Sequence, residues 1–275
     1  MEYTELIKKA IAEDLGGGED VTSLATVDES ERATAEFRSR KNGVVAGVNV
    51  AKETLEILGI TDVEILISDG QKVRAGEVLL RARGNTRSLL LAERTALNFL
   101  GHLSGIATLT HLWVDAVAGS TTQIRDTRKT TPGLRELEKY AVRMGGGVNH
   151  RLTLGESALI KDNHIEAAGG VAAAFFRVRS MYPTLEVEVE VDTLDQLREI
   201  VPLAPDLILL DNMSVKDCAS AVSIVNGAIK LEASGGLTLE NAKSYASTGV
   251  DYLAVGALTH SAPVLDIGLD LKAEI

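Results

Sequence analysis

The 275-residue sequence contains a single cysteine, Cys218, so it can form neither an internal disulfide framework nor a cysteine-based metal centre. Such sparing use of cysteine is typical of a reducing compartment, and we expect a cytoplasmic protein. No apolar run approaches the roughly 20 residues needed to span a bilayer. The acidic N-terminal residues also lack the apolar core of a signal peptide. These absences argue against a membrane-spanning or disulfide-stabilised secreted protein.

The sequence also lacks the surplus of basic residues that a nucleic-acid-binding surface needs, because its formal net charge is −11. Basic residues nevertheless predominate between positions 125 and 161, where eight lysines and arginines stand against four acidic residues. One basic region in an acidic protein favours a cleft that attracts a small anion. A solvated helix face is the alternative for residues 134–144. It explains less well the basic residues at strand ends or in glycine-rich loops, which are Arg128, Lys129, Arg151 and Lys161.

No Gly-x-Gly-x-x-Gly motif opens a helix, which weakens the case for a dinucleotide-binding site. From residue 123 onward strand and helix patterns alternate, which predicts parallel strands with right-handed crossovers. The predicted strands are 123–127, 158–162, 186–192, 206–211, 229–234 and 252–256, and the predicted helices are 134–144, 165–181, 193–201, 215–225 and 239–248. An open doubly wound sheet and a barrel both have this alternation. Functional-looking residues at every strand end favour the barrel, although a complete barrel has eight strands.

The first hundred residues predict a separate α+β unit. We expect an acidic helix at 3–15, strands at 33–39, 44–48 and 63–68, and a helix at 49–58 that Asn49 caps and Gly59 ends. A long helical stretch at 85–118 follows, and Gly101 with Ser104-Gly105 is predicted to break it into two helices at the domain junction. Arg94 lies in this stretch as either a surface residue with a buried stem or a charge directed into a site.

Glycines follow the last two predicted strands, in Ser234-Gly235-Gly236 and Val255-Gly256. Backbone N–H groups at such strand-to-helix turns form a cradle for phosphate. A tight turn that needs glycine for steric reasons alone is the alternative. Two such turns on neighbouring late strands favour phosphate.

Carboxylates occupy the middle of the domain. Glu186, Glu188 and Glu190 alternate along one predicted strand and therefore share a face, and Asp211 closes the next strand. Inward carboxylates in a barrel are costly unless they are paired or bound to a cation. Two carboxylates from neighbouring strands, Glu190 and Asp211, are suited to binding Mg²⁺, holding ribose hydroxyls or stabilising a developing cation. An internal ion-pair network is the alternative, above all for Glu186 and Glu188.

Seven motifs, in this order along nearly the whole chain, resemble the quinolinate phosphoribosyltransferase family, also called nicotinate-nucleotide pyrophosphorylase (carboxylating). They are Glu93-Arg-Thr-Ala-Leu-Asn-Phe-Leu with Leu103-Ser-Gly-Ile-Ala-Thr, Thr127-Arg-Lys-Thr-Thr-Pro-Gly, Asn149-His-Arg, Leu159-Ile-Lys-Asp-Asn-His, Glu188-Val-Glu-Val, Leu210-Asp-Asn and Glu232-Ala-Ser-Gly-Gly. The resemblance implies that quinolinate and phosphoribosyl pyrophosphate react, with Mg²⁺, to nicotinate mononucleotide, pyrophosphate and CO₂ in NAD biosynthesis. It also implies the type II phosphoribosyltransferase fold.

In that α/β fold, an N-terminal α/β sandwich (1–104) precedes an open barrel of six to seven strands (105–264), and the tail 265–275 returns to the first domain. The resemblance further implies an obligate homodimer in which Arg94 reaches the partner's site. Around the quinolinate carboxylates it places Arg94, Arg128, His150, Arg151 and Lys161.

The resemblance assigns the remaining roles as follows. Lys129 bridges a carboxylate and the diphosphate and is catalytic together with Glu190 and Asp211, which hold the ribose and Mg²⁺. The 5-phosphate cradle is Ser234, Gly235, Gly236 and Gly256, and the substrate-binding set also includes Thr127, Ala257 and His260.

Three alternatives remain at this point. The first two are related phosphoribosyltransferases of the same fold, either ModD-like proteins of molybdenum-transport clusters or a nicotinate-specific enzyme. The third is a non-catalytic barrel that binds a sugar phosphate. The number of cations separates the enzymes, because a monocarboxylate needs fewer than Arg94, Arg128, Arg151 and Lys161 together provide.

Overall fold

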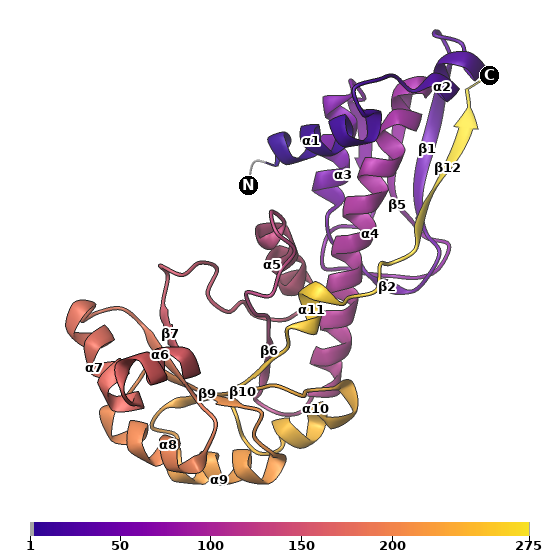
Figure 1. Cartoon of the computed structure of the whole chain (residues 1–275). Coiled ribbons are helices and arrows are strands. Elements are labelled where there is room, and N and C mark those ends of the chain that lie inside the picture. Colours follow the sequence, from indigo (N-terminus) through magenta and orange to yellow (C-terminus); the bar gives the residue numbers. More distant parts are fainter. Residues whose placement is uncertain (1–2, 275) are drawn as a thin grey trace. The chain divides into compact units, whose positions relative to one another are not determined.

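The computed structural model describes residues 3–274, which form two compact units (Figure 1). The first unit contains the chain up to Leu109, the short segment Arg143–Gly145 and the C-terminal residues from Ala262 onward. The second unit contains Thr110–Val142 and Gly146–Ser261. The last residue of the predicted returning tail, 275, lies outside the described residues. No helix within residues 3–274 combines the length and apolarity that crossing a membrane requires.

The first unit is built on an antiparallel sheet in the order β12-β1-β5-β3. Its elements are α1 (Thr4–Leu15), α2 (Val21–Thr26), β1 (Arg32–Ser39), β2 (Gly43–Val44), α3 (Val48–Ile57), β3 (Asp62–Ile65), β4 (Lys72–Val73), β5 (Val78–Asn85), α4 (Thr86–Ala116, which continues into the second unit) and β12 (Ile267–Ala273). The short strands β2 and β4 pair separately. Figure 1 shows the last strand, β12, lying beside β1 from the start of the chain.

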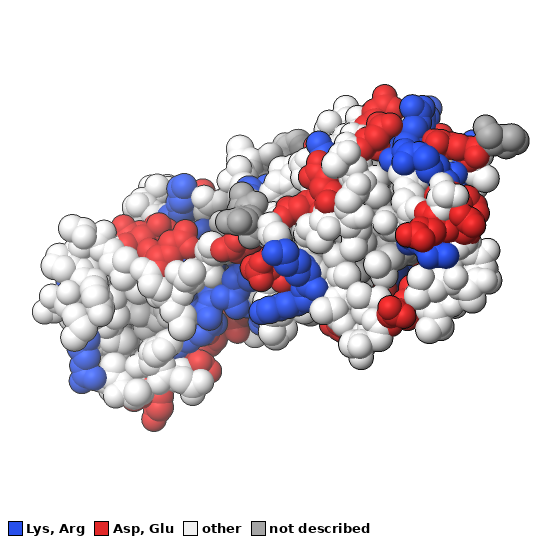
Figure 2. All heavy atoms as spheres, turned by 90° about the horizontal axis from the view of Figure 1, so that it is seen from above, with Lys and Arg blue, Asp and Glu red and all other residues white. Residues whose placement is uncertain are grey.

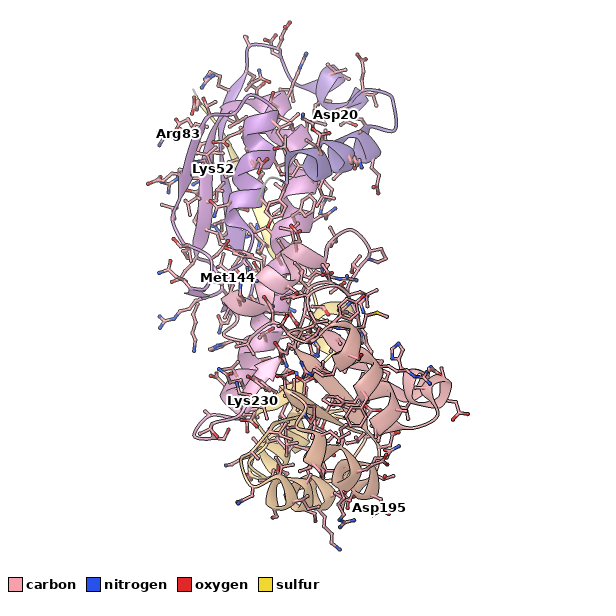
Figure 3. The ribbon with its side chains drawn as sticks, turned by 90° about the vertical axis from the view of Figure 1, so that its left-hand side faces the viewer. Asp20, Lys52, Arg83, Met144, Asp195 and Lys230 are labelled. Carbon is pink, nitrogen blue, oxygen red and sulfur yellow. The ribbon has the colours of Figure 1, made fainter. Side chains whose placement is uncertain are left out.

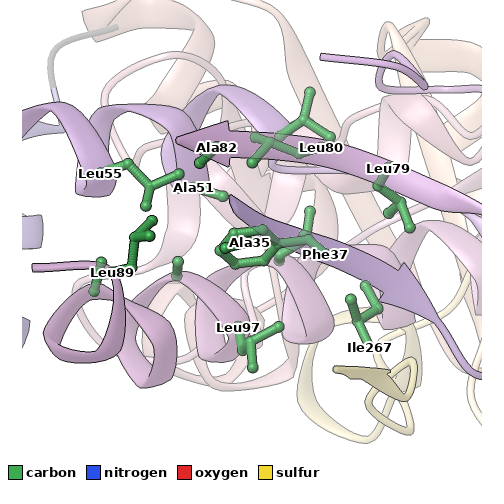
Figure 4. Close-up of a cluster of buried hydrophobic side chains, with 14 of the residues drawn as sticks. Ala35, Phe37, Ala51, Leu55, Leu79, Leu80, Ala82, Leu89, Leu97 and Ile267 are labelled. Atoms are coloured by element: carbon green, nitrogen blue, oxygen red, sulfur yellow. The ribbon is translucent and has the colours of Figure 1, made fainter. Parts of the chain in front are cut away.

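Apolar side chains of the sheet and of two helices form the core of this unit. Phe37 from β1, Leu55 from α3 and Leu89 from α4 are each fully buried in it. Figure 4 shows these side chains meeting between the strands and the helices, together with Ile267 of β12. Burial of this apolar surface is the main force that holds the N-terminal and C-terminal segments in one unit.

Helix α4 is continuous, and the prediction that Gly101 and Ser104-Gly105 break it is wrong. Both glycines instead allow the segment after Ser261 to pack closely. A Cβ on Gly101 would lie 2.9 Å from Val264 Cγ1, and one on Gly105 would overlap the carbonyl oxygen of Pro263. Ser104 bonds the backbone of Ala46, accepting from its N–H at 3.0 Å and donating to its carbonyl at 3.1 Å.

The strand predicted at 44–48 is also wrong for most of its length, because β2 ends at Val44 and α3 begins at Val48. The N-cap of α3 is Gly47 rather than Asn49. Gly47 adopts a left-handed conformation with φ +98°, and a Cβ there would lie 2.8 Å from Leu103 Cδ1. Only glycine meets both requirements without strain.

The second unit is a parallel α/β array. Its elements are β6 (Gln123–Arg125), α5 (Arg135–Met144), β7 (Ala158–Ile160), α6 (Asp162–Ala168), α7 (Val171–Met181), β8 (Val187–Val191), α8 (Leu194–Ile200), a 3₁₀ turn (Val201–Leu203), β9 (Leu207–Asp211), α9 (Val215–Val225), β10 (Lys230–Ser234), α10 (Leu239–Ala246), β11 (Tyr252–Ala254) and α11 (Ala257–His260). The strand order is β6-β11-β10-β9-β8-β7.

All six predicted strands are present and parallel, so the predicted fold class is confirmed. The end strands β6 and β7 do not pair with each other within the described residues, which leaves the barrel open. The helix predicted at 165–181 is two helices, because Gly169 and Gly170 between them have φ of +83° and +137°. Figure 1 shows α8, α9 and α10 along one side of the strands.

Candidate active site

The carboxyl ends of the parallel strands bring the polar side chains together. Lys161 directly follows β7, Glu190 is the second-last residue of β8, and Asp211 ends β9. Ser234 ends β10 and lies opposite Asp211 in the register of the β9–β10 pair. Parallel strands all end at the same edge of a sheet, and ligands of open α/β sheets and barrels bind at that edge.

A cavity of about 390 Å³ lies at these strand ends, and every residue that lines it belongs to the second unit. The structure brings together nine of the predicted site residues around it: Thr127, Arg128, Lys129, His150, Arg151, Lys161, Glu190, Asp211 and Ser234. Four further residues complete the lining, namely Leu159, Leu209, Glu232 and Ala254. The cavity therefore combines cations and carboxylates with a small apolar wall.

Two of the cavity's guanidinium groups have unused hydrogen-bonding capacity. The Nε atoms of Arg128 and Arg151 are both buried and, within the described structure, have no hydrogen-bond partner. Arg151 uses Nη1 to donate to the Ser157 carbonyl at 2.6 Å, which fixes its direction. Burial and the neighbouring charge of Arg128 lower the pKa of Arg151. Two adjacent cations with unused donors form a favourable place for an anionic ligand.

In the chain as a whole, 39 acidic residues outnumber 28 lysines and arginines. On the face seen in Figure 2, groups of acidic and groups of basic side chains lie among uncharged ones. Because the net charge is −11, a cavity with four lysines and arginines in its lining stands out against the rest of the chain. Such a contrast attracts small anions to the cavity.

The carboxylates lie on neighbouring strands of the same cavity. Glu190 forms an ion pair with Lys161. Asp211 accepts a hydrogen bond at 2.7 Å from the side-chain amide of Asn212, and burial raises the pKa of Asp211. A bound cation would offset the cost of burying this carboxylate. Carboxylate oxygens are the ligands that Mg²⁺ prefers, so Glu190 and Asp211 fit a magnesium site.

Lys129 is held from both sides of its peptide backbone. Its N–H donates to Thr127 Oγ1 at 3.0 Å, and its carbonyl accepts from Thr259 Oγ1 at 2.8 Å. Thr259 was not among the predicted site residues, and no motif in the sequence indicated it. These two bonds position Lys129 at the cavity wall.

Six predicted residues are not among the residues lining the cavity: Arg94, Gly235, Gly236, Gly256, Ala257 and His260. Gly256 and His260 are nevertheless close to Lys129, because a Cβ on Gly256 would lie 3.2 Å from both Lys129 Cδ and His260 Nε2. Gly235 has φ +83°, and its added Cβ would overlap the Asn212 side chain. Arg94 belongs to α4, and its side chain is 61% exposed. The structure of one chain therefore does not place Arg94 in this cavity.

A group of buried ionisable residues includes two that line the cavity, His150 and Glu232, and two that do not, Arg125 and Glu188. Arg125 donates to Glu232 at 2.9 Å, while His150 Nε2 is 2.9 Å from Glu188 Oε2 and 3.6 Å from Glu232 Oε1. Burial raises the pKa of Glu188 and that of Glu232 to about 7, and burial lowers the pKa of His150 to about 4. His150 is therefore neutral near pH 7, and its 2.9 Å contact with Glu188 is not one between a cation and a carboxylate.

Sequence reasoning left Glu232 without a role, and gave Glu188 only as a member of an ion-pair network. A usable signal existed for Glu232, which lies two residues before Ser234 on the same strand and therefore shares its face. Glu188 is buried and Glu186 is exposed, so only the former belongs to the internal network. Asp126 and Lys139, an almost fully buried ion pair beside His150, were also missed.

The amino ends of the strands have a different character. Lys230, labelled in Figure 3, begins β10 and donates to the Tyr252 hydroxyl at 3.1 Å. The guanidinium of Arg125 stacks over the same ring at 4.7 Å from its centroid. These contacts join the first residues of β10 and β11 to Arg125, the last residue of β6.

Comparison with known protein families gives matches over both parts of the chain. The model of the quinolinate phosphoribosyl transferase N-terminal domain matches residues 20–104, and that of the C-terminal domain matches residues 106–270.

Individual proteins with similar sequences or structures carry names of the same family. The nicotinate-nucleotide pyrophosphorylase [carboxylating] of Mycobacterium leprae is 53% identical over 273 residues, which are 97% of this chain and 96% of that protein. A probable nicotinate-nucleotide pyrophosphorylase [carboxylating] of Synechocystis is 40% identical over 96% of this chain and 91% of its own length. The crystal structure of the nicotinate-nucleotide pyrophosphorylase of Ehrlichia chaffeensis is 39% identical, covers 99% of both chains and superimposes with a TM-score of 0.95.

Proposed function

The chain belongs to the quinolinate phosphoribosyltransferase family, and we propose that it transfers the phosphoribosyl group of phosphoribosyl pyrophosphate to quinolinate with decarboxylation. The products are nicotinate mononucleotide, pyrophosphate and CO₂, in the biosynthesis of NAD. The observation that carries this function is the pair Arg128 and Arg151 in the lining of the cavity. Within the described structure, the buried Nε of each has no hydrogen-bond partner. The single cysteine, Cys218, is buried and free, and we propose that the protein acts in the cytoplasm.

The cations of the cavity match the charge of the aromatic dicarboxylate. A guanidinium pairs with a carboxylate through two parallel hydrogen bonds, so Arg128 and Arg151 are suited to hold the carboxylates of quinolinate. Lys161 adds a third positive charge to the lining of the cavity. Lys129 lies between these residues and the Gly256 turn, where it is placed to contact both a carboxylate and the diphosphate.

The carboxylates that line the cavity, Glu190 and Asp211, are suited to bind the sugar. Glu190 and Asp211 accept hydrogen bonds from the ribose hydroxyls, and their negative charge stabilises the oxocarbenium-like C1 as pyrophosphate departs. We propose that the same two carboxylates hold Mg²⁺, directly or through water, and that the ion neutralises charge on the leaving diphosphate. Backbone N–H groups at Ser234–Gly236 and Gly256–Ala257, with His260 beside them, bind the 5-phosphate.

The reaction balances without any other cofactor. The bond between ribose C1 and the pyrophosphate oxygen breaks as the ring nitrogen of quinolinate forms a bond to C1. The ring nitrogen then carries a positive charge, so the adjacent carbon can release its carboxylate as CO₂ and keep the electron pair. A proton taken up at that carbon completes nicotinate mononucleotide. The protein contributes by orienting the two substrates and by balancing their charges.

A direct assay separates this function from the alternatives. Purified protein is incubated with phosphoribosyl pyrophosphate, Mg²⁺ and either quinolinate or nicotinate, and nicotinate mononucleotide and CO₂ are measured. We expect product with quinolinate. Turnover of nicotinate without turnover of quinolinate would overturn the proposal in favour of a nicotinate-specific enzyme, and binding without turnover of either would favour a non-catalytic barrel.

Replacing Arg128 tests the carboxylate site itself. The variant Arg128→Ala is expected to weaken quinolinate binding at least about 100-fold, because one carboxylate loses a buried, charge-assisted partner. Calorimetric titration measures this affinity, and the thermal unfolding midpoint checks the fold. Arg198→Ala, which removes an exposed arginine of α8, is the matched control. Unchanged quinolinate affinity in Arg128→Ala would count against the assigned role.

We also propose that the enzyme is a homodimer in which Arg94 completes the partner's quinolinate site. Its exposed guanidinium has only a loose contact with Glu93, at 3.8 Å, and is available for such a contact. Arg94→Ala and Lys129→Ala chains, each inactive alone, are mixed and allowed to exchange subunits. In a mixed dimer one site receives both intact residues, so about a quarter of the wild-type sites should be restored. No recovery despite proven exchange would mean that Arg94 acts within its own chain or not at all.

A further inference from the structure

His150 lines the cavity, but both of its ring nitrogens are engaged by the protein. The backbone N–H of Arg151 donates to His150 Nδ1 at 2.7 Å. On the other side of the ring, Nε2 lies 2.9 Å from Glu188 Oε2. With 7% of its surface exposed, the side chain has little room to turn away from either contact.

These two contacts determine the tautomer of the ring. A nitrogen that accepts from a backbone N–H carries no proton of its own, so the proton of the neutral ring is on Nε2. That nitrogen lies 2.9 Å from a carboxylate oxygen of Glu188. A second proton, on Nδ1, would face the Arg151 N–H and break the contact. The ring therefore has no free N–H to offer a ligand.

The charges around the ring agree with a neutral imidazole. The ionisable groups that face it come from five parts of the second unit: Glu188 on β8, Glu232 and Arg125 on β10 and β6, Lys139 on α5 and Arg151 beside it. Burial is the main cause that lowers the pKa of His150, and the three cations add to it, whereas Glu232 opposes it. A positive charge on His150 is unfavourable because it would be buried.

The backbone of His150 is held as firmly as its side chain. Its N–H donates to Asp126 Oδ1 at 2.8 Å, and its carbonyl accepts from Lys139 Nζ at 2.8 Å. Asp126 and Lys139 are themselves an ion pair with almost no exposure. The next residue is Arg151, whose buried Nε has no protein partner. All of these bonds converge on the peptide that sets the direction of the Arg151 guanidinium.

We propose that His150 is a positioning residue, a neutral Nε2–H imidazole anchored by Glu188 that fixes the Arg151 backbone and acts on the anionic substrate only through Arg151. The identity of that substrate as quinolinate rests on the proposed function. This role differs from direct contact with the quinolinate carboxylates, around which the resemblance places His150.

Nuclear magnetic resonance of the wild-type protein tests the tautomer. Long-range ¹H–¹⁵N correlation spectra of protein labelled in its five histidines distinguish the Nε2–H form, the Nδ1–H form and the imidazolium. Comparison with His150→Gln assigns the signals. We expect His150 to stay in the Nε2–H form between about pH 6 and pH 8 and to keep that form when quinolinate is added. A doubly protonated ring in the quinolinate complex would overturn the proposal.

Two substitutions separate positioning from direct contact. In His150→Asn the side-chain oxygen takes the place of Nδ1 and still accepts from Arg151. In His150→Gln the side-chain amide takes the place of Nε2, still donates to Glu188, and leaves the Arg151 N–H without its acceptor. We expect the KM for quinolinate to rise about tenfold or more in the glutamine variant and only about threefold in the asparagine variant. An equal rise in the KM for quinolinate in both variants, or a larger rise in the asparagine variant, would contradict the proposal.

The KM for phosphoribosyl pyrophosphate and kcat serve as internal controls. Both should change little in either variant, because the defect is confined to the carboxylate site, whereas a general loss of structure would change all three parameters. If the wild-type protein forms no nicotinate mononucleotide, the proposed function fails. The tautomer measurement on the free protein still decides whether His150 is held as described.

Discussion

At the scale of single residues, the site depends on buried charges that never reach the cavity. Asp126 accepts from Lys139, from the Asn149 side chain and from the His150 N–H, so one carboxylate holds two separate segments, helix α5 and the loop at 149–150. Burial raises the pKa of Asp126 and lowers that of Lys139, and each shift measures the cost of enclosing these charges. Removing one partner of such a pair is far more damaging than removing both. The pair therefore stabilises the loop 149–151 in one conformation.

Glu232 makes a testable contribution to the dependence of stability on pH. Burial raises its pKa from 4.5 to about 7, so in this range the folded chain binds more protons at Glu232 than the unfolded chain does. Stability therefore falls as pH rises from 4.5 through 7, and Glu188 acts in the same direction. His150, with its pKa lowered from 6.5 to about 4, acts in the opposite direction between those values.

The variant Glu232→Gln, which keeps an acceptor for Arg125 but cannot ionise, should therefore lose less stability than wild type as pH rises. The difference should be on the order of 3 kcal/mol or less across the window, at 1.36 kcal/mol for each pKa unit. Urea unfolding at several pH values between about 5 and 8 measures it. Glu199→Gln, an exposed change on α8, is the control. If the free energy of unfolding changed with pH in the same way in Glu232→Gln and in wild type, Glu232 would already be ionised in the folded chain at pH 5.

The sequence predicts the residues at the strand ends better than the contacts among the buried ionisable residues, for a physical reason. Lys161, Asp211 and Ser234 each end a strand, and the carboxyl ends of parallel strands meet at one edge whatever the precise register. Contacts such as that between His150 and Glu188 depend on which residues of different strands lie level with each other. Periodicity within one strand does not contain that information.

At the scale of elements, helix α4 shows why glycine spacing can be misinterpreted. Gly101 and Gly105 are one turn apart, so they lie on the same face of the helix. The carbonyl of Gly101 accepts from the Leu265 N–H at 3.0 Å, and the segment 263–265 packs over both glycines. The glycines permit close approach of a distant segment and do not end the helix. A single sequence does not reveal that segment.

Whether the variant Gly105→Ala raises or lowers the free energy of unfolding depends on this packing. Within a helix, alanine is favoured over glycine by about 1 kcal/mol, so without the contact the change would stabilise. Because the new Cβ would overlap the Pro263 carbonyl and lie 3.1 Å from Val264 Cα, we expect a loss of about 1–3 kcal/mol instead. Denaturant unfolding measures the change. Gly18→Ala, where the Cβ meets only Leu15 O at 3.5 Å, is the control, and stabilisation by Gly105→Ala would refute the contact.

At the scale of the whole molecule, the fold class follows from the alternation of strands and helices, while the first unit is harder to predict. Its sheet contains β1, β5 and β3 from the start of the chain and β12 from its end. The motif resemblance, and not the pattern of residues, indicated that the tail returns to the first domain. Apolar residues alternate with other residues along β12, which is typical of a strand, but alternation within one strand does not indicate which strand it pairs with.

Deleting residues 267–275 tests how much the first unit depends on this last strand. The deletion removes seven residue pairings with β1, the core side chain Ile267 and the ion pairs of Asp270 with Arg38 and Arg40. Burying an isoleucine or leucine contributes about 1.5–3 kcal/mol, so with Leu269 also lost we expect the free energy of unfolding to fall by about 4 kcal/mol or more.

The exposed edge of β1 would also present unpaired N–H and C=O groups, so the truncated chain should aggregate more readily than the full chain. Thermal unfolding and light scattering measure the two effects, and the point variant Leu271→Ala, at a side chain that is 38% exposed, should change neither by much. If the truncated chain unfolds at the wild-type temperature and stays monodisperse at the wild-type size, β12 contributes no net stability. The close packing of segment 263–265 on α4 would then be sufficient to hold the C-terminal residues in the first unit.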